Sequence, residues 1–130
     1  FDMLSWVFGE RRGCVVHLHR PDVAAGVLEL ERARVRWFLS INPAHLPQAA
    51  RAAGQRTYRT LEIDGEAFEF SEGFTDLHTR TYAEILAGNG CRLEDARQAI
   101  ETAHIIRTSP PIGVAGERHP FCDAVRGIDA

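Results

Sequence analysis

The order of two hydrophobic periodicities along the chain constrains its fold more than any other feature. Apolar and polar side chains alternate with a period of two from Gly13 to His19 and again from Arg34 to Ile41, so both segments are expected to be strands. From Thr75 onward, apolar residues recur with helical spacing. Strands grouped ahead of helices predict an α+β fold, in which an open, mainly antiparallel β-sheet is covered on one face by helices.

A β-hairpin is the clearest local signal. The dipeptide Asp64-Gly65 accepts the positive φ angles of a two-residue type I′ turn, and the flanking segments 58–63 and 66–70 alternate as strands do. A further strand is expected over residues 27–31. Residues 42–55 contain two prolines and an alanine-rich run, and they predict a long connection with one helical turn.

Three helices are expected, over residues 1–8, 75–87 and 93–108. The first is apolar around most of its circumference and is ended by Gly9, so it should be buried between other elements. The inward stripes of the other two are expected to consist of Tyr82, Ile85 and Leu86 in the first of them, and of Ala96, Ile100, Ala103 and Ile106 in the second.

The strand over 34–41 carries apolar residues on both faces, since Phe38 lies opposite Trp37. Both faces of the sheet are therefore expected to be covered, one by the helices and the other by a partner subunit or another domain. The sequence has no repeat and no linker, so residues 1–130 are expected to form a single domain.

Charge and composition limit the classes of function. All 15 basic residues are arginine, and with 18 acidic residues the formal net charge is -3. The lack of lysine excludes a lysine Schiff base and a phosphate loop that ends in lysine. The lack of a basic excess argues against a nucleic-acid partner. No apolar stretch is long enough to span a membrane, and the three cysteines are too far apart for a paired motif, so a cytoplasmic protein with reduced thiols is expected.

The six histidines do not predict a metal site. His17 and His19 lie two residues apart, a spacing that some metal sites use, but no carboxylate or cysteine stands at a matching position. A pair of neutral histidines at an edge or interface is the expected arrangement. His45 and His119 lie in turn-rich segments, where solvated or local capping roles are expected, and His104 is expected to be a structural helix residue.

One group of polar side chains indicates a binding site. Thr75, His78, Thr79 and Tyr82 are spaced at i, i+3, i+4 and i+7, so they share one helical face. They predict a polar pocket at one end of the helix. Two structural alternatives stay open, with Thr75 as an N-cap and Tyr82 as a core ring. No nucleophile elbow, glycine-rich phosphate loop or clustered Asp pair occurs, so no catalytic residue is expected in the chain.

Blocks along nearly the whole chain resemble a known family. Residues 1–9, Phe-Asp-Met-Leu-Ser-Trp-Val-Phe-Gly, resemble the helix that follows a Gly-Ile/Val-His motif in oxidoreductases of the glucose-fructose oxidoreductase, inositol dehydrogenase and MocA-like family. The more specific block, residues 73–82, is similar to UDP-N-acetylglucosaminuronate 3-dehydrogenases within that family. Further blocks that resemble this subgroup lie at residues 28–41, 56–59, 84–88, 93–97 and 119–121.

The resemblance implies that the chain is the C-terminal domain, of the dihydrodipicolinate-reductase-like kind, of a two-domain enzyme. In this family an N-terminal Rossmann domain binds NAD, while the C-terminal domain helps to bind substrate and forms a homo-oligomer through its β-sheet. The subgroup oxidises the 3-hydroxyl of a UDP-sugar uronate on the route to lipopolysaccharide O-antigen. The family's catalytic lysine and histidine would lie outside this chain, so the chain alone is expected to be inactive.

Site residues follow from position in the matching block. Thr75, His78 and Thr79 are implied to form the wall of the substrate pocket, and Asp2 to fix the helix behind the catalytic histidine. Two alternatives remain open. One is a non-catalytic dimerisation or small-ligand-binding module of the same fold, and the other is a family member that acts on another sugar or inositol.

Overall fold

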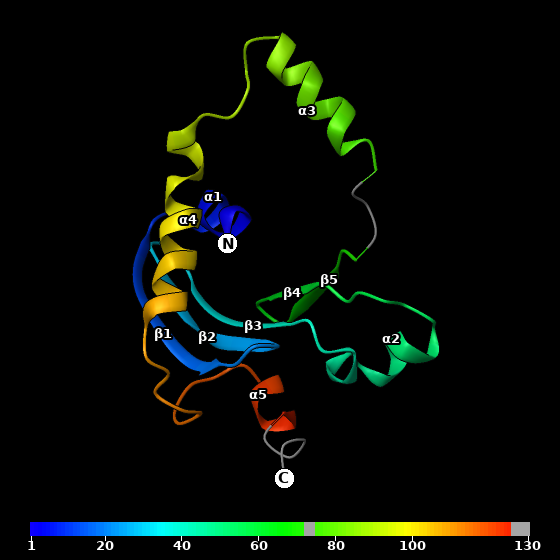
Figure 1. Ribbon diagram of the computed structural model, residues 1–130, viewed down its shortest axis with the longest axis vertical. Coiled ribbons are helices and arrows are strands. Elements are labelled where there is room, and N and C mark those ends of the chain that lie inside the picture. The colour runs from blue at the N-terminus through cyan, green and yellow to red at the C-terminus, as the bar shows by residue number, and fades with distance from the viewer. Residues whose placement is uncertain (72–74, 126–130) are drawn as a thin grey trace. The chain divides into compact units, whose positions relative to one another are not determined.

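The computed structural model describes residues 1–71 and 75–125 (Figure 1). The chain divides into two compact units, the first formed by Phe1–Ile41 with the chain from Cys91 onward, and the second by Asn42–Gly90. Gly73 and Phe74, which open the family-like block, lie outside the described residues.

The elements follow the order that the periodicities predict. The first unit contains α1 (Asp2–Phe8), β1 (Arg11–His19), β2 (Val23–Leu30), β3 (Arg34–Ser40), α4 (Leu93–Thr108) and α5 (Phe121–Ala124). The second unit contains the 3₁₀ helix η1 (Pro43–His45), α2 (Gln48–Ala52), β4 (Thr60–Ile63), β5 (Glu66–Glu69) and α3 (Leu77–Leu86). The described strands form two antiparallel sheets, β1-β2-β3 and β4-β5, so the α+β class is confirmed.

The three-stranded sheet depends on a close approach at its centre. Gly26 of β2 lies opposite Val16 of β1 and opposite Trp37 of β3. A Cβ atom on Gly26 would lie 2.1 Å from the carbonyl oxygen of Val15 and 2.8 Å from Cζ2 of Trp37. Glycine is therefore required here, because the carbonyl oxygen of Val15 and the indole of Trp37 together occupy the space that a Cβ atom would take.

One face of this sheet packs against α1 and α4, which lie beside each other in Figure 1. The edge of the Phe1 ring meets the ring of Trp37 at a centroid distance of 5.5 Å. The buried cluster on this face consists of Val16, Leu28, Leu30, Trp37 and Ile106. Burial of apolar side chains is the main force that holds α4 on the sheet.

Helix α1 ends before Gly9 as expected, but it is not buried all round. Leu4 and Phe8 pack against the core, while Trp6 is 84% exposed. The expectation of a helix buried between other elements is therefore wrong for one side of α1. Within the described residues, α1 meets the sheet and α4 through a single face, so the apolar side chains on its far side stay in solvent.

The inward stripe expected of helix α4 is confirmed at Ile106 and in part at the half-buried Ala96 and Ala103, but it is wrong at Ile100. Ile106 is buried, but Ile100 is 58% exposed and Thr102 takes the second inward position. Six residues rotate an α-helix by about 240° beyond whole turns, so Ile100 and Ile106 cannot face the same core, whereas Thr102 and Ile106 are four residues apart and can. Asp95 accepts a hydrogen bond from the backbone N–H of Arg92 at 2.7 Å, which fixes the start of the helix.

The second face of the sheet is covered in part by the chain itself. Phe38, which lies on this face opposite Ala25, contacts the rings of His119 and Phe121 at centroid distances of 5.7 and 5.6 Å. The prediction that Phe38 is covered is confirmed. Around Phe38 the cover comes from the C-terminal segment, so the chain itself supplies part of the cover that was expected from a partner subunit or another domain.

The second unit is mostly exposed. Asp64 and Gly65 have φ angles of 52° and 85°, which confirms the predicted type I′ hairpin between β4 and β5. The connection over 42–55 holds both η1 and α2, so it is more helical than expected. Among the described residues of this unit, Ala50 is the one buried hydrophobic side chain.

Candidate functional site

The candidate site lies at the start of α3. Asp76 occupies the N-cap position with a left-handed backbone, φ 59°, and the helix begins at Leu77. Thr75 therefore lies in the preceding turn, and it is not the N-cap that one alternative assigned to it.

The helix brings three of the four predicted polar residues onto one face. His78 and Tyr82 are one turn apart, and Thr79 lies beside them at the i+3 spacing to Tyr82. Arg80 and Glu84 project from the opposite side of the helix, as their positions in the turn require. The spacing that predicts this face is therefore present, while the placement of Thr75 depends on the turn before the helix.

This face of α3 is open in the described chain. Tyr82, Ile85 and Leu86 are 66%, 52% and 88% exposed, so the prediction that they form a core stripe is wrong for this chain. Tyr82 is likewise not a core ring. An amphipathic pattern predicts which side chains share a face, but whether the face is buried depends on what packs against it, and no described element of its own unit covers this one.

The side chains of the candidate site have unused hydrogen-bonding capacity. Among residues 1–71 and 75–125, none forms a hydrogen bond with the side chain of Thr75, His78 or Thr79. The hydroxyl of Thr81, which flanks this face, instead donates to the carbonyl oxygen of Leu77 at 2.8 Å. An exposed imidazole and two exposed hydroxyls can bind a ligand rich in hydroxyl or carboxylate groups.

The histidines of β1 do not form the expected edge pair. A register shift between Val16 and Leu18 breaks the alternation, so His17 is buried while His19 is exposed. Nδ1 of His17 lies 2.8 Å from the carbonyl oxygen of Gly113. A β-bulge leaves no clear signal in the sequence, so this role could not be read from the spacing. The described residues contain no group of three His, Cys, Asp or Glu side chains that could hold a metal ion.

The cysteines are free, as expected, and two of them are poor nucleophiles. Burial raises the pKa of the Cys14 thiol above its ordinary value. Burial, and then the nearby carboxylate of Asp123, raise the pKa of Cys122. Both thiols therefore stay protonated near neutral pH, where a thiolate is needed for nucleophilic attack.

The fold and the sequence blocks together match a part of a dehydrogenase, although no protein-family profile matches the chain. Two of the solved structures that the chain is similar to are of the WlbA (WbpB) dehydrogenase from Thermus thermophilus. Its crystal structure in complex with NAD and alpha-ketoglutarate is 53% identical over 92% of this chain, with a TM-score of 0.86. Its crystal structure in complex with NAD and UDP-GlcNAcA is 50% identical over 92% of this chain, also with a TM-score of 0.86.

The chain spans 39% of the length of that dehydrogenase. The resemblance to a dehydrogenase family that the sequence blocks carry is thereby confirmed, as is the α+β fold that the resemblance implies. None of the described helices has the length and hydropathy needed to cross a membrane.

Proposed function

We propose that the chain is the C-terminal part of an NAD-dependent dehydrogenase that oxidises the 3-hydroxyl of a UDP-N-acetyl-hexuronate sugar. The observation that carries the proposal is the 50% identity, over 92% of the chain, with a dehydrogenase whose crystal structure holds NAD and UDP-GlcNAcA. Identity at this level extends through the fold and supports a shared type of substrate.

NAD is bound by another part of the enzyme in this proposal. The described strands pair only antiparallel, and the sequence has no Gly-x-Gly-x-x-Gly turn between a strand and a helix, so the chain does not fit a dinucleotide. The chain also lacks lysine, the residue that the resemblance implies for proton removal. This chain contributes to substrate binding, and hydride transfer to NAD takes place on residues beyond it.

Thr75, His78 and Thr79 form the wall of the substrate pocket in this proposal. All three are exposed, and their side chains make no hydrogen bond within the described residues. Hydroxyl and imidazole groups suit the hydroxyls and the carboxylate of a hexuronate, since each can donate or accept. Their role is to orient the sugar, so the expected effect of removing one of them falls on substrate binding.

The assembly, compartment and pathway are also part of the proposal. A homo-oligomer formed through the β-sheet is supported by Leu39, in β3, and Ile41, directly after it, which are 54% and 83% exposed. A cytoplasmic location is supported by three free cysteines. A role in lipopolysaccharide O-antigen synthesis follows from the proposed substrate.

Turnover by the whole protein that carries this chain tests the proposal. We expect NADH to form with UDP-GlcNAcA and not with the uncharged UDP-GlcNAc. Replacing His78→Ala should raise KM for the UDP-sugar about tenfold, because one hydrogen bond to a charged group is lost, and leave KM for NAD unchanged. Arg80→Ala, on the opposite side of α3, is the matched control and should change neither constant.

Two outcomes would contradict different parts of the proposal. If no UDP-uronate supported NADH formation, the assigned activity would be wrong. If turnover occurred but His78→Ala and Arg80→Ala behaved alike, the activity would stand and the assignment of the pocket wall to α3 would be wrong.

A further inference from the structure

The segment that follows α4 crosses the sheet on the face opposite the helices. We call residues 109–125 the strap, and we call the face of the sheet that carries Ala25, Val27 and Phe38 the outer face. In Figure 1 the strap leaves the end of α4 and finishes in α5, on the other side of the strands from α1. Apart from the four residues of α5, the strap has no helix or strand of its own.

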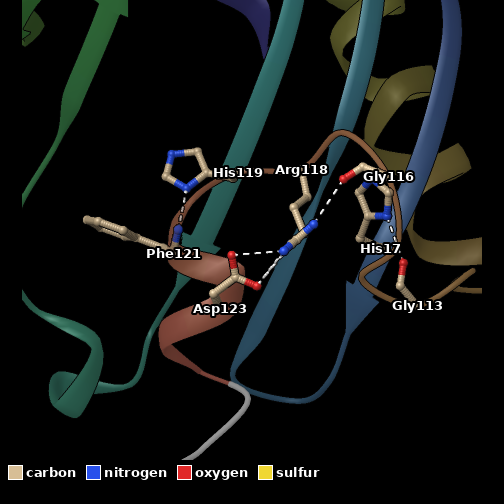
Figure 2. A network of polar contacts seen from close by, with 7 residues as sticks. All are labelled: His17, Gly113, Gly116, Arg118, His119, Phe121 and Asp123. Carbon is tan, nitrogen blue, oxygen red and sulfur yellow. Dashed lines mark hydrogen bonds and ion pairs between the residues drawn. The ribbon is translucent and has the colours of Figure 1, made fainter.

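Hydrogen bonds, an ion pair and ring contacts join the strap to the strands. The N–H of Ile112 donates to the carbonyl oxygen of Val16 at 2.9 Å, and Nδ1 of His17 lies 2.8 Å from the carbonyl oxygen of Gly113 (Figure 2). Further along the strap, Glu117 forms an ion pair of 2.8 Å with Arg34 of β3. The rings of His119 and Phe121 both contact the ring of Phe38.

The end of the strap also has internal contacts. The guanidinium of Arg118 donates to both carboxylate oxygens of Asp123, at 3.0 and 3.1 Å, and to the carbonyl oxygen of Gly116 (Figure 2). The N–H of Phe121 donates to Nδ1 of His119 at 3.2 Å. These bonds hold the last turn of the strap in one shape, so that it can move as a body.

The strap has little buried apolar surface of its own. Cys122 and Val125 are the two buried hydrophobic side chains among its residues. The ion pair that joins Glu117 of the strap to Arg34 of β3 is exposed, since each of these side chains is about half exposed. Exposed ion pairs add little stability, and segments with few buried apolar contacts open more readily than the core. By contrast, α4 and the strands share the cluster around Trp37 and Ile106.

We propose that the strap is a conformational device that closes over the outer face of the sheet, latched by His17, Arg34 and Phe38, and opens as one unit while the sheet and α4 stay folded. Opening exposes Cys122 and bares the buried side chains Ala25 and Val27. Closing covers apolar surface that the sheet would otherwise present to solvent.

The three cysteines of this chain provide the test. Alkylation of the whole protein, followed peptide by peptide with mass spectrometry, gives a rate for each thiol. Cys122 reports the strap and Cys14, in β1, reports the sheet, while the exposed Cys91 shows that reagent and pH are unchanged. Replacing Phe121→Ala should raise the alkylation rate of Cys122 about tenfold and leave that of Cys14 unchanged, because the lost ring contact holds only the strap.

Matched variants separate the latch from general destabilisation. Arg34→Ala removes the ion pair to Glu117 and should raise the Cys122 rate about threefold. Arg36→Ala should leave the Cys122 rate unchanged, because Arg36, two residues further along β3, forms no ion pair with any described residue. If Cys122 and Cys14 sped up together, or if Arg34→Ala and Phe121→Ala left the Cys122 rate as it was, the proposal would be overturned.

Hydrogen exchange on the unsubstituted protein gives an independent outcome. The amide of Ile112 donates to the carbonyl oxygen of Val16 across the contact between strap and sheet, so it should exchange with a protection factor about tenfold or more below that of Val27 in β2. A protection factor equal to that of Val27 would show that the strap and sheet open only together, and would overturn the proposal.

Discussion

At the scale of single residues, Gly26 is a position that does not tolerate a side chain. Its missing Cβ leaves the space that the indole of Trp37 fills, and the nearest backbone atom would lie 2.1 Å from an added methyl group. We expect Gly26→Ala to lower the free energy of unfolding by about 3 kcal/mol, because β1 and β2 must move apart to clear the Val15 carbonyl oxygen and the Trp37 indole must also shift. Urea unfolding measures this change.

Gly13→Ala is the matched control, since it makes the same substitution in the neighbouring strand. The nearest atom to its Cβ would be Oε2 of Glu29, at 2.9 Å, and that is the end of a flexible side chain that can move aside. We expect a loss below about 0.5 kcal/mol. Equal losses for the two variants would mean that the Trp37 packing does not set the requirement at Gly26.

The buried thiols predict how stability depends on pH. Burial raises the pKa of Cys14 and Cys122 from the ordinary value of 9.0, so the folded protein favours the neutral thiols. Below pH 9 both the folded and the unfolded chain keep these protons. Above it the unfolded chain loses them first, so the free energy of unfolding should fall by up to about 1.4 kcal/mol per pH unit for each thiol.

Urea unfolding below and above pH 9 measures whether the free energy of unfolding falls in alkali. The same measurement on the Cys122→Ala variant shows whether the Cys122 thiol causes the fall. The variant should be less stable at every pH because it loses a fully buried side chain, but its stability should fall less steeply in alkali. A slope that is the same in the variant and the unsubstituted protein would assign the alkaline loss to other groups.

At the scale of elements, the start of α4 depends on one carboxylate. Asp95 accepts from the N–H of Arg92 at 2.7 Å, which satisfies a backbone donor that the helix itself cannot pair. Asp95→Ala should lower the free energy of unfolding by about 1 kcal/mol, and Asp95→Asn should recover part of it because the amide oxygen still accepts. Thermal unfolding followed by circular dichroism tests this. Identical midpoints for the Ala and Asn variants would show that the bond contributes nothing.

Elements defined by local spacing could be predicted from the sequence. The hairpin follows from Asp64-Gly65, and the end of α3 from the glycine that follows Ala87. The early start of β2 could not be predicted. The pattern indicates a strand only from residue 27, whereas β2 begins at Val23. Ala24, Ala25 and Gly26 are too small to show an alternation, and their pairing with β1 and β3 decides their conformation.

In the candidate site, too, local spacing predicts some features, while others depend on contacts between elements. The spacing of His78, Thr79 and Tyr82 predicts that they share a face of α3, since this depends only on helical geometry. It does not predict whether that face is buried, because burial depends on surfaces beyond the helix. The bulge at His17 is likewise set by the pairing of β1 with β2, and the strap contact to Gly113 joins residues 96 positions apart, so no local pattern records either of them.

At the scale of the whole molecule, the exposed apolar face of α3 determines how the chain behaves on its own. Tyr82, Ile85 and Leu86 lie on one side of the helix, each more than half exposed. Side chains of this kind, gathered on one face, are usually covered by another surface. We therefore expect the isolated 130-residue chain to self-associate, with an average mass above 14.5 kDa that rises with concentration in sedimentation equilibrium.

Substitutions on the two sides of α3 locate the contact. Leu86→Glu should lower the average mass, because it places a charge in the apolar face of α3, whereas Arg80→Glu on the other side should not. Added sulfate should strengthen the association, since exclusion of this salt from protein surfaces favours apolar burial and screening would weaken ion pairs. A single-chain mass at high concentration, with or without sulfate, would contradict the prediction and leave α3 as a helix that remains soluble without a covering surface.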